Sequence, residues 1–118
     1  MKVIVAGSRE VKSYELVERA IEDSGFDITE VVCGAARGVD SLGAEWAQDH
    51  GVPVKYFPAE WKRYGRAAGS KRNEQMAEYA EALIAIPIAR SKGTKHMISA
   101  ATKRGMPMFV VNVDAESL

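Results

Sequence analysis

The sequence is poor in cysteine and has no excess of charge of either sign. Cys33 is the only cysteine, and the 16 Lys and Arg residues equal the 16 Asp and Glu residues in number. A single cysteine excludes an internal disulfide framework and a cysteine-based metal cluster, and it favours a reducing compartment. Zero net charge argues against binding nucleic acid through bulk charge, although it is compatible with a local basic pocket.

Long apolar runs and histidine pairs are also missing. The N-terminal apolar run ends at Gly7, which is too early for the core of a signal peptide or for a helix that spans a bilayer. His50 and His96, the two histidines, do not have the spacing of a metal-ligand pair. Because there is also no lipidation signal, linker or long repeat, we expect residues 1–118 to form one cytoplasmic domain with no membrane partner, no metal and no cofactor.

Apolar runs alternate with helical segments along the whole chain. Hydrophobic residues make up 47% and charged residues 27%, as in ordinary globular proteins. The alternation predicts an α/β fold, a single Rossmann-like three-layer domain with about five parallel strands and helices on both faces. Ligands of such sheets bind outside the carboxyl ends of the strands, where the strand order reverses. The expected strands are residues 3–6, 31–33, 53–57, 83–86 and 108–111. The expected helices run from Ser13 to Gly25, from Asp40 or Ser41 to Gly51, from about Ala68 to Tyr79 and from Gly93 or Thr94 to Gly105. An irregular segment is expected at 58–68.

Gly7, Ser8 and Arg9 follow the first expected strand. A glycine lets the backbone approach a ligand closely, Ser8 can donate a hydrogen bond, and Arg9 can bind a phosphate through two N–H groups. The full glycine spacing of the dinucleotide-binding fingerprint is missing. A tight turn with a solvated Arg9 explains the same residues, so both interpretations stay open.

The stretch Gly34-Ala35-Ala36-Arg37-Gly38-Val39-Asp40 follows the second expected strand. Its two glycines and small side chains precede a helix, where free N–H groups can face an anion, and Arg37 adds positive charge. We expect Asp40 to cap this helix, and hydrogen bonding to a ribose is the alternative.

Basic and aromatic residues crowd the segment after the third expected strand. Arg66, Lys71 and Arg72 lie near a helix start, where they suit phosphates, and a segment of this length is often a functional lid. The ring of Trp61 or of Tyr64 can stack on a base. The alternative is a solvated basic face with Trp61 packed into the core, and for Trp61 the core position is favoured.

Ser91, Gly93 and Thr94 open the last expected helix. Hydroxyls, free N–H groups and the helix dipole converge there, which indicates a phosphate-binding turn. The P-loop spacing is absent, so hydrolysis of a nucleoside triphosphate is not expected. His96 is expected on the surface.

Four such loops at the ends of four successive strands predict one shared pocket.

These motifs together resemble one known family. They are Gly7-Ser8-Arg9, the stretch from Gly34 to Asp40, Pro58-Ala59-Glu60-Trp61, Gly65-Arg66-Ala67-Ala68-Gly69, Arg72-Asn73 with Met76, and Gly93-Thr94 with Met97. In this order they resemble the YspA-like (cpYpsA-related) branch of the SLOG superfamily, which is named after DprA (Smf) and the LOG enzymes. The resemblance covers nearly the whole chain and implies a Rossmann-like sheet, a pocket for a nucleotide or an ADP-ribose-type ligand, and a homodimer. It implies that the pocket is lined or shaped by Gly7, Ser8, Arg37, Gly38, Arg72, Asn73, Gly93 and Thr94.

The chain departs from the LOG phosphoribohydrolases at their catalytic motif. That motif reads Pro-Gly-Gly-x-Gly-Thr-x-x-Glu, and its glutamate is catalytic. Here Gly93 and Thr94 are kept, but Met97 stands in place of the glutamate, and a thioether is neither a base nor a nucleophile. The carboxylates that remain as substitutes for glycosidic-bond cleavage are Glu60, Glu74 and Asp40.

Three functions are compatible with these residues. We favour a protein that binds a small phosphorylated nucleoside or an ADP-ribose-type nucleotide as a sensor, carrier or sequestering protein. The first alternative is an enzyme, a hydrolase of the N-glycosidic bond of a nucleotide. The second is DprA-like binding of single-stranded DNA, because Ala36-Arg37-Gly38-Val39-Asp40 resembles the Ala-Arg-Gly-Ile-Asp stretch of DprA. Zero net charge disfavours nucleic acid as a partner.

Overall fold

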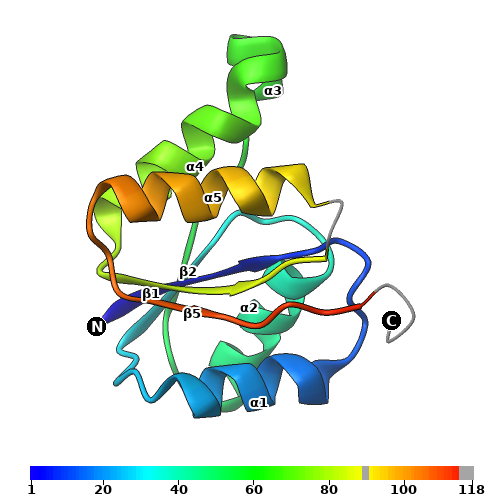
Figure 1. Cartoon of the computed structure of the whole chain (residues 1–118), viewed down its shortest axis with the longest axis vertical. Coiled ribbons are helices and arrows are strands. Elements are labelled where there is room, and N and C mark those ends of the chain that lie inside the picture. The colour runs from blue at the N-terminus through cyan, green and yellow to red at the C-terminus, as the bar shows by residue number, and fades with distance from the viewer. Residues whose placement is uncertain (89–90, 115–118) are drawn as a thin grey trace.

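A five-stranded parallel sheet lies between two layers of helices (Figure 1). This computed structural model describes residues 1–88 and 91–114, and the strand order within them is β3-β2-β1-β4-β5. The α/β, Rossmann-like three-layer fold predicted from the sequence is confirmed. The strands are β1 (Lys2–Gly7), β2 (Glu30–Cys33), β3 (Val54–Tyr56), β4 (Ala82–Ile86) and β5 (Met108–Val110). The helices are α1 (Tyr14–Ser24), α2 (Val39–Asp49), α3 (Trp61–Tyr64), α4 (Ala68–Tyr79) and α5 (Lys92–Lys103). A 3-10 turn, η1 (Gly65–Ala67), precedes α4.

Local sequence signals explain the first helix and the central strands. The hydroxyl of Ser13 caps α1 by accepting a hydrogen bond from the N–H of Leu16 at 3.2 Å. Gly25, with φ 70, ends the same helix in the left-handed conformation that glycine adopts readily. All five residues of β4 are buried, as the unbroken apolar run predicts for a strand covered on both faces.

Two regions differ from the sequence-based prediction. Helix α2 begins at Val39 with Gly38 at its N-cap, and no side chain caps it. Asp40 therefore does not have the capping role expected of it, because its carboxylate points to the loop after β2 instead. The segment expected to be irregular contains α3 and η1, which lead directly into α4. Helix α3 buries none of its residues, so it has no apolar periodicity by which to recognise it.

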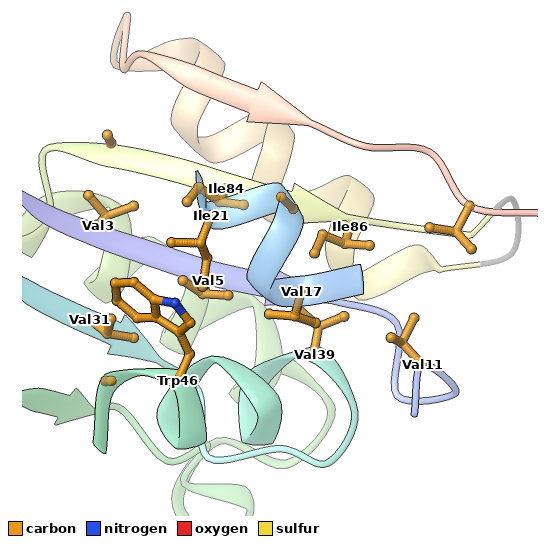
Figure 2. Packing of buried hydrophobic residues seen from close by; sticks show 14 of the residues in the cluster. Val3, Val5, Val11, Val17, Ile21, Val31, Val39, Trp46, Ile84 and Ile86 are labelled. Atoms are coloured by element: carbon orange, nitrogen blue, oxygen red, sulfur yellow. The ribbon is translucent and has the colours of Figure 1, made fainter. Parts of the chain in front are cut away.

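Each face of the sheet has its own apolar core. Helices α1 and α2 cover one face, where aliphatic side chains of β1, β2 and β4 pack with Trp46 (Figure 2). Helices α4 and α5 cover the other face, where Met76 and Met97 are buried against Ile4 and Leu83. The sheet is thus held from both sides. In the ranges 1–88 and 91–114, no helix is both long enough and apolar enough to cross a membrane.

The strand order reverses at β1. Strands β2 and β3 lie on one side of β1, and β4 and β5 lie on the other. Gly7 at the end of β1 is in register with Ile86 at the end of β4, so the loops that follow these strands start side by side. Connections that diverge in this way leave a crevice at the carboxyl ends, which is where ligands of open α/β sheets bind.

Candidate functional site

A cavity of about 510 Å³ opens at the carboxyl ends of β1 and β4. Its walls come from the loops after β1, β2 and β4 and from helices α3, α4 and α5. Such a volume lies within the range of small-molecule sites, about 300–1,000 Å³. The polar and aromatic residues that line it are Ser8, Arg9, Glu10, Asp40, Trp61, Arg66, Ser70, Arg72, Asn73, Ser91, Lys92, Thr94 and His96, together with Gly7, Gly69 and Gly93.

The loop after β1 is fixed between its neighbours by main-chain hydrogen bonds. The N–H of Ser8 donates to the carbonyl oxygen of Ile86 at 3.0 Å, and the N–H of Val39 donates to the carbonyl oxygen of Ser8 at 3.1 Å. The Ser8 side chain is buried, and its hydroxyl accepts a hydrogen bond from the N–H of Glu10 at 3.0 Å. Gly38 has φ 77, and a side chain there would overlap the backbone of Ser8 and Arg9. The cavity floor is therefore preformed.

Asp40 links the loop after β1 to the loop after β2. Its Oδ2 accepts a hydrogen bond from the buried N–H of Gly34 at 3.1 Å. Burial raises the pKa of Asp40 from 3.8 to about 6, against the lowering effect of the Arg72 guanidinium and of the N–H groups of Gly34, Ala36 and Gly7. A carboxylate occupied in this way holds backbone in place, which explains why it does not cap α2.

Arg72 lies over the loop after β2. One of its terminal N–H groups donates to the carbonyl oxygen of Gly34, and its Nε donates to Oδ1 of Asn73 at 3.2 Å. The guanidinium occupies the space that a side chain at Gly34 would need. Arg72 is half-buried beside Asp40 and lines the cavity, so it presents a positive charge whose orientation is already set.

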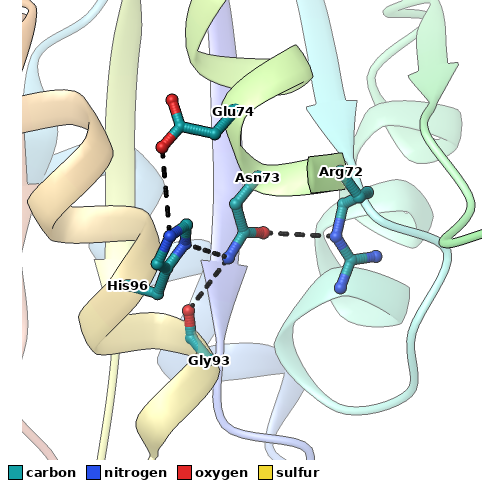
Figure 3. A network of polar contacts seen from close by, with 5 residues as sticks. All are labelled: Arg72, Asn73, Glu74, Gly93 and His96. Atoms are coloured by element: carbon teal, nitrogen blue, oxygen red, sulfur yellow. Dashed lines mark hydrogen bonds and ion pairs between the residues drawn. The ribbon is translucent and has the colours of Figure 1, made fainter. Parts of the chain in front are cut away.

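Asn73 connects α4 to the start of α5 (Figure 3). Its Nδ2 donates to the carbonyl oxygen of Gly93 at 3.1 Å and contacts Nδ1 of His96 at 3.2 Å. Because an amide nitrogen only donates, Nδ1 of His96 is the acceptor, and a neutral imidazole then has its proton on Nε2. That nitrogen lies 3.9 Å from Oε1 of Glu74. The His96 ring is thus oriented at the cavity wall from two sides.

Positive charge predominates around the cavity. Among the described residues that line the cavity, four are cationic (Arg9, Arg66, Arg72 and Lys92), whereas Glu10 and Asp40 are acidic. Within residues 1–88 and 91–114, no side chain caps the first turn of α5, because the hydroxyl of Ser91 accepts from the N–H of Ile88 instead. The N–H groups and dipole of this helix end therefore act in the same direction as the cations, and together they favour an anion.

The structure brings most of the predicted ligand-binding residues together. Those that line the cavity are Gly7, Ser8, Arg9, Asp40, Trp61, Arg66, Arg72, Asn73, Ser91, Gly93 and Thr94. Gly34 and Gly38 lie behind it and shape its floor, whereas Arg37 and Lys71 have exposed side chains that are not part of the lining. Trp61 is 55% exposed, so its expected place in the core is wrong.

The candidate carboxylates are distributed differently from the prediction. Glu60 and Glu74 do not line the cavity, whereas Asp40 does. Sequence reasoning missed Glu10, and it expected His96 on the surface although His96 is half-buried in the cavity wall. Ser70 was also missed, and its spacing of three residues from Asn73 on α4 is the signal that identifies it. No group of three or more His, Cys, Asp or Glu side chains in the described part of the chain is arranged to hold a metal ion.

Comparisons with known proteins agree with this architecture. The profile of the YspA, cpYpsA-related SLOG family matches residues 1–64. The Gene 61 protein of Mycobacterium phage D29 is 33% identical over an alignment of 118 positions, which covers 92% of this chain and 94% of the phage protein. The crystal structure of DNA processing protein A (DprA) from Streptococcus pneumoniae superposes with a TM-score of 0.72 at 21% identity. The match covers 92% of this chain and 49% of that one, so the chain spans about half the length of DprA, and the likeness concerns the fold.

Proposed function

The chain belongs to the YspA, cpYpsA-related SLOG family, and from this premise we propose that its cavity binds a phosphorylated nucleoside or an ADP-ribose-type nucleotide. The observation that carries the proposal is the combination of four cationic side chains with an uncapped helix end at the point where the strand order reverses. Each of these features favours a phosphate by itself, and here they surround a single cavity.

The phosphate is proposed to lie between the loop after β1 and the start of α5. Arg72 supports this position, because hydrogen bonds to Gly34 and Asn73 orient its guanidinium before any ligand arrives. An oriented arginine loses less side-chain entropy on binding than a mobile one. Arg9 and Lys92 have exposed side chains that can close on the anion from the solvent side.

Binding without turnover is the version of the function that the carboxylates favour. Asp40 uses its Oδ2 to hold the N–H of Gly34, and Glu60 and Glu74 lie outside the cavity lining. Met97 takes the position of the LOG glutamate and is buried. We therefore propose a sensor, carrier or sequestering protein.

Hydrolysis of an N-glycosidic bond is the second candidate, and one observation favours it. Glu10 lines the cavity next to Arg9, so a carboxylate does lie within the proposed site. Glycosidic-bond cleavage needs such a group as an acid or a nucleophile near the anomeric carbon. If this function is correct, Glu10→Gln should abolish base release and leave nucleotide binding in place.

Single-stranded DNA binding is not favoured. The likeness to DprA is at the level of the fold, and the chain has no net charge. A DNA-binding function would give an affinity for single strands that falls steeply with salt concentration. A titration of fluorescent oligonucleotide at two salt concentrations measures this directly.

Two further expectations are proposals. We propose a homodimer, because Met108 and Val110 of the edge strand β5 are 37% and 39% exposed. Light scattering should then give twice the mass of the 12.9 kDa chain. We propose a cytoplasmic location, since Cys33 is a free buried thiol, and fractionation of the producing cells tests it.

The first test of the proposed function is a thermal-shift panel of nucleoside monophosphates, ADP and ADP-ribose, with chromatography of each mixture. A ligand that binds the folded state raises its midpoint of unfolding according to its concentration over its dissociation constant. A shift with the ligand recovered intact supports a binding protein. Released base or ribose phosphate supports the hydrolase, and no shift with any phosphorylated nucleoside contradicts the proposed function.

A further inference from the structure

A second cavity of about 350 Å³ adjoins the first. Ala36 and Asp40 line both cavities, so the two are separated only by the loop after β2 and the first turn of α2. The remaining lining comes from the loop after β2, from one side of α2 and from the end of β3. It consists of Ala35, Ser41, Ala44, Glu45, Gln48 and Tyr56.

The chemistry of the second cavity differs from that of the first. No lysine, arginine or histidine is found among its lining residues in the described part of the chain, and Asp40 and Glu45 are acidic. A phosphate would be repelled there. The small side chains of Ala35, Ala36 and Ala44 leave room for a flat group, and Ala35 has φ 60, a strained conformation that is common at binding sites.

Tyr56 supplies an aromatic surface at this point. It is 48% exposed and ends β3, where it is in register with Cys33 at the start of the loop after β2. A tyrosine ring on a rigid strand can stack on a base whatever the base is. Glu45 and Gln48 lie one helical turn apart on α2. Their side-chain oxygens are hydrogen-bond acceptors, which suit an exocyclic amino group.

We propose that the second cavity is a base subsite, which receives an amino-bearing base such as adenine from the same ligand whose phosphate lies in the first cavity. This inference rests on the proposed function. It assigns the base to Tyr56 and not to Trp61, the other exposed aromatic residue, which lies among the cations of the first cavity. The ligand would cross between the cavities at Asp40 and Ala36.

The test compares ADP with pyrophosphate, which carries the same phosphates and no base. Calorimetric titration of Tyr56→Ala should show ADP affinity reduced about 5- to 150-fold and pyrophosphate affinity unchanged, since loss of a base stack has that effect. Tyr56→Phe keeps a ring and should bind ADP nearly normally. Tyr64→Ala is the matched control, because Tyr64 lines neither cavity, and it should bind both ligands normally.

The outcomes separate this inference from the proposed function. If ADP binds normally to Tyr56→Ala, or if Trp61→Ala alone loses base-dependent affinity, the base subsite is wrong and the phosphate site stands. If the unaltered protein binds pyrophosphate as tightly as ADP, the base contributes nothing and the subsite is again wrong. If the unaltered protein binds neither ADP nor any other phosphorylated nucleoside or ADP-ribose of the thermal-shift panel, both proposals are overturned. Far-UV circular dichroism of each variant verifies that the fold is intact.

Discussion

Replacing Gly38 with alanine should destabilise the fold more than the same replacement at Gly65, and the difference measures how tightly the loops after β1 and β2 pack. The two glycines have similar backbones, with φ 77 and ψ −131 at Gly38 and φ 55 and ψ −130 at Gly65. In the part of the chain that the structure describes, nothing lies within 4 Å of the position that a Cβ would take at Gly65. A Cβ at Gly38 would lie 2.5 Å from Cα and 2.7 Å from the carbonyl carbon of Arg9.

The magnitude follows from two separate costs. A residue with a side chain in this backbone conformation loses about 1–3 kcal/mol, and both variants share that cost. Overlap with main-chain atoms adds about 1–3 kcal/mol at Gly38 alone, because backbone cannot move aside as the end of a side chain can. Gly38→Ala should therefore lower the free energy of unfolding by about 2–6 kcal/mol, against about 1–3 kcal/mol for Gly65→Ala.

Urea denaturation, monitored by far-UV circular dichroism, measures the free energy of unfolding that each variant loses. If the two variants lose the same amount, the close approach of Gly38 to Ser8 and Arg9 does not exist in solution. The preformed cavity floor would then be wrong as well. A larger loss of unfolding free energy for Gly65→Ala than for Gly38→Ala would contradict both the overlap at Gly38 and the shared backbone cost.

Three other predictions concern polar residues that line the cavity. Asp40→Ala should lower the free energy of unfolding by about 3 kcal/mol, because the buried N–H of Gly34 loses its acceptor and the half-buried Arg72 guanidinium loses the nearby carboxylate that offsets its charge. Urea denaturation measures this loss, and an unchanged free energy of unfolding would contradict it. Since the pKa of Asp40 is about 6 in the folded protein against 3.8 in the unfolded chain, its contribution to stability is largest below pH 4 and falls by about 3 kcal/mol in total as the pH rises through 6. Urea midpoints from pH 4 to 7, relative to Asp40→Asn, test this, and a contribution that rises with pH would refute the burial effect. Asn73→Ala should lower the free energy of unfolding by about 1–3 kcal/mol and weaken ligand binding, because it removes the hydrogen bond from α4 to the carbonyl oxygen of Gly93. Gln75→Ala, on the exposed side of α4, should do neither in the same assays. Equal effects of the two variants would contradict the link between α4 and α5.

The fold was predictable because its strongest signals are local. The buried run of β4 and the glycine that ends β1 indicate strands covered on both faces, and Ser13 and Gly25 mark both ends of α1. Helix α3 was not predictable in this way, because it is short and buries none of its residues. Its place depends on the helix that follows it.

The site was predictable only where a residue type itself indicates chemistry. Glycine-rich loops and arginines identified most of the lining, but the sequence does not show which way an arginine points, so Arg9 and Arg37 looked alike. The role of Asp40 depends on contacts with loops after two different strands, which no local pattern records. His96 was missed for the same reason, since Asn73, on another helix, turns its ring toward the cavity.

Arg9 and Arg37 provide the most direct test of the central claim. Both are exposed arginines on neighbouring loops, but Arg9 lines the cavity and Arg37 does not. In calorimetric titrations with ADP-ribose or the phosphorylated nucleoside that gives the largest thermal shift, Arg9→Ala should lose about 1.5–3 kcal/mol of binding free energy, roughly 10- to 150-fold in affinity, as expected for a charged hydrogen bond to phosphate. Arg37→Ala should bind like the unaltered protein. Equal affinities for both variants, or a loss only for Arg37→Ala, would contradict the assignment of this cavity as the nucleotide site.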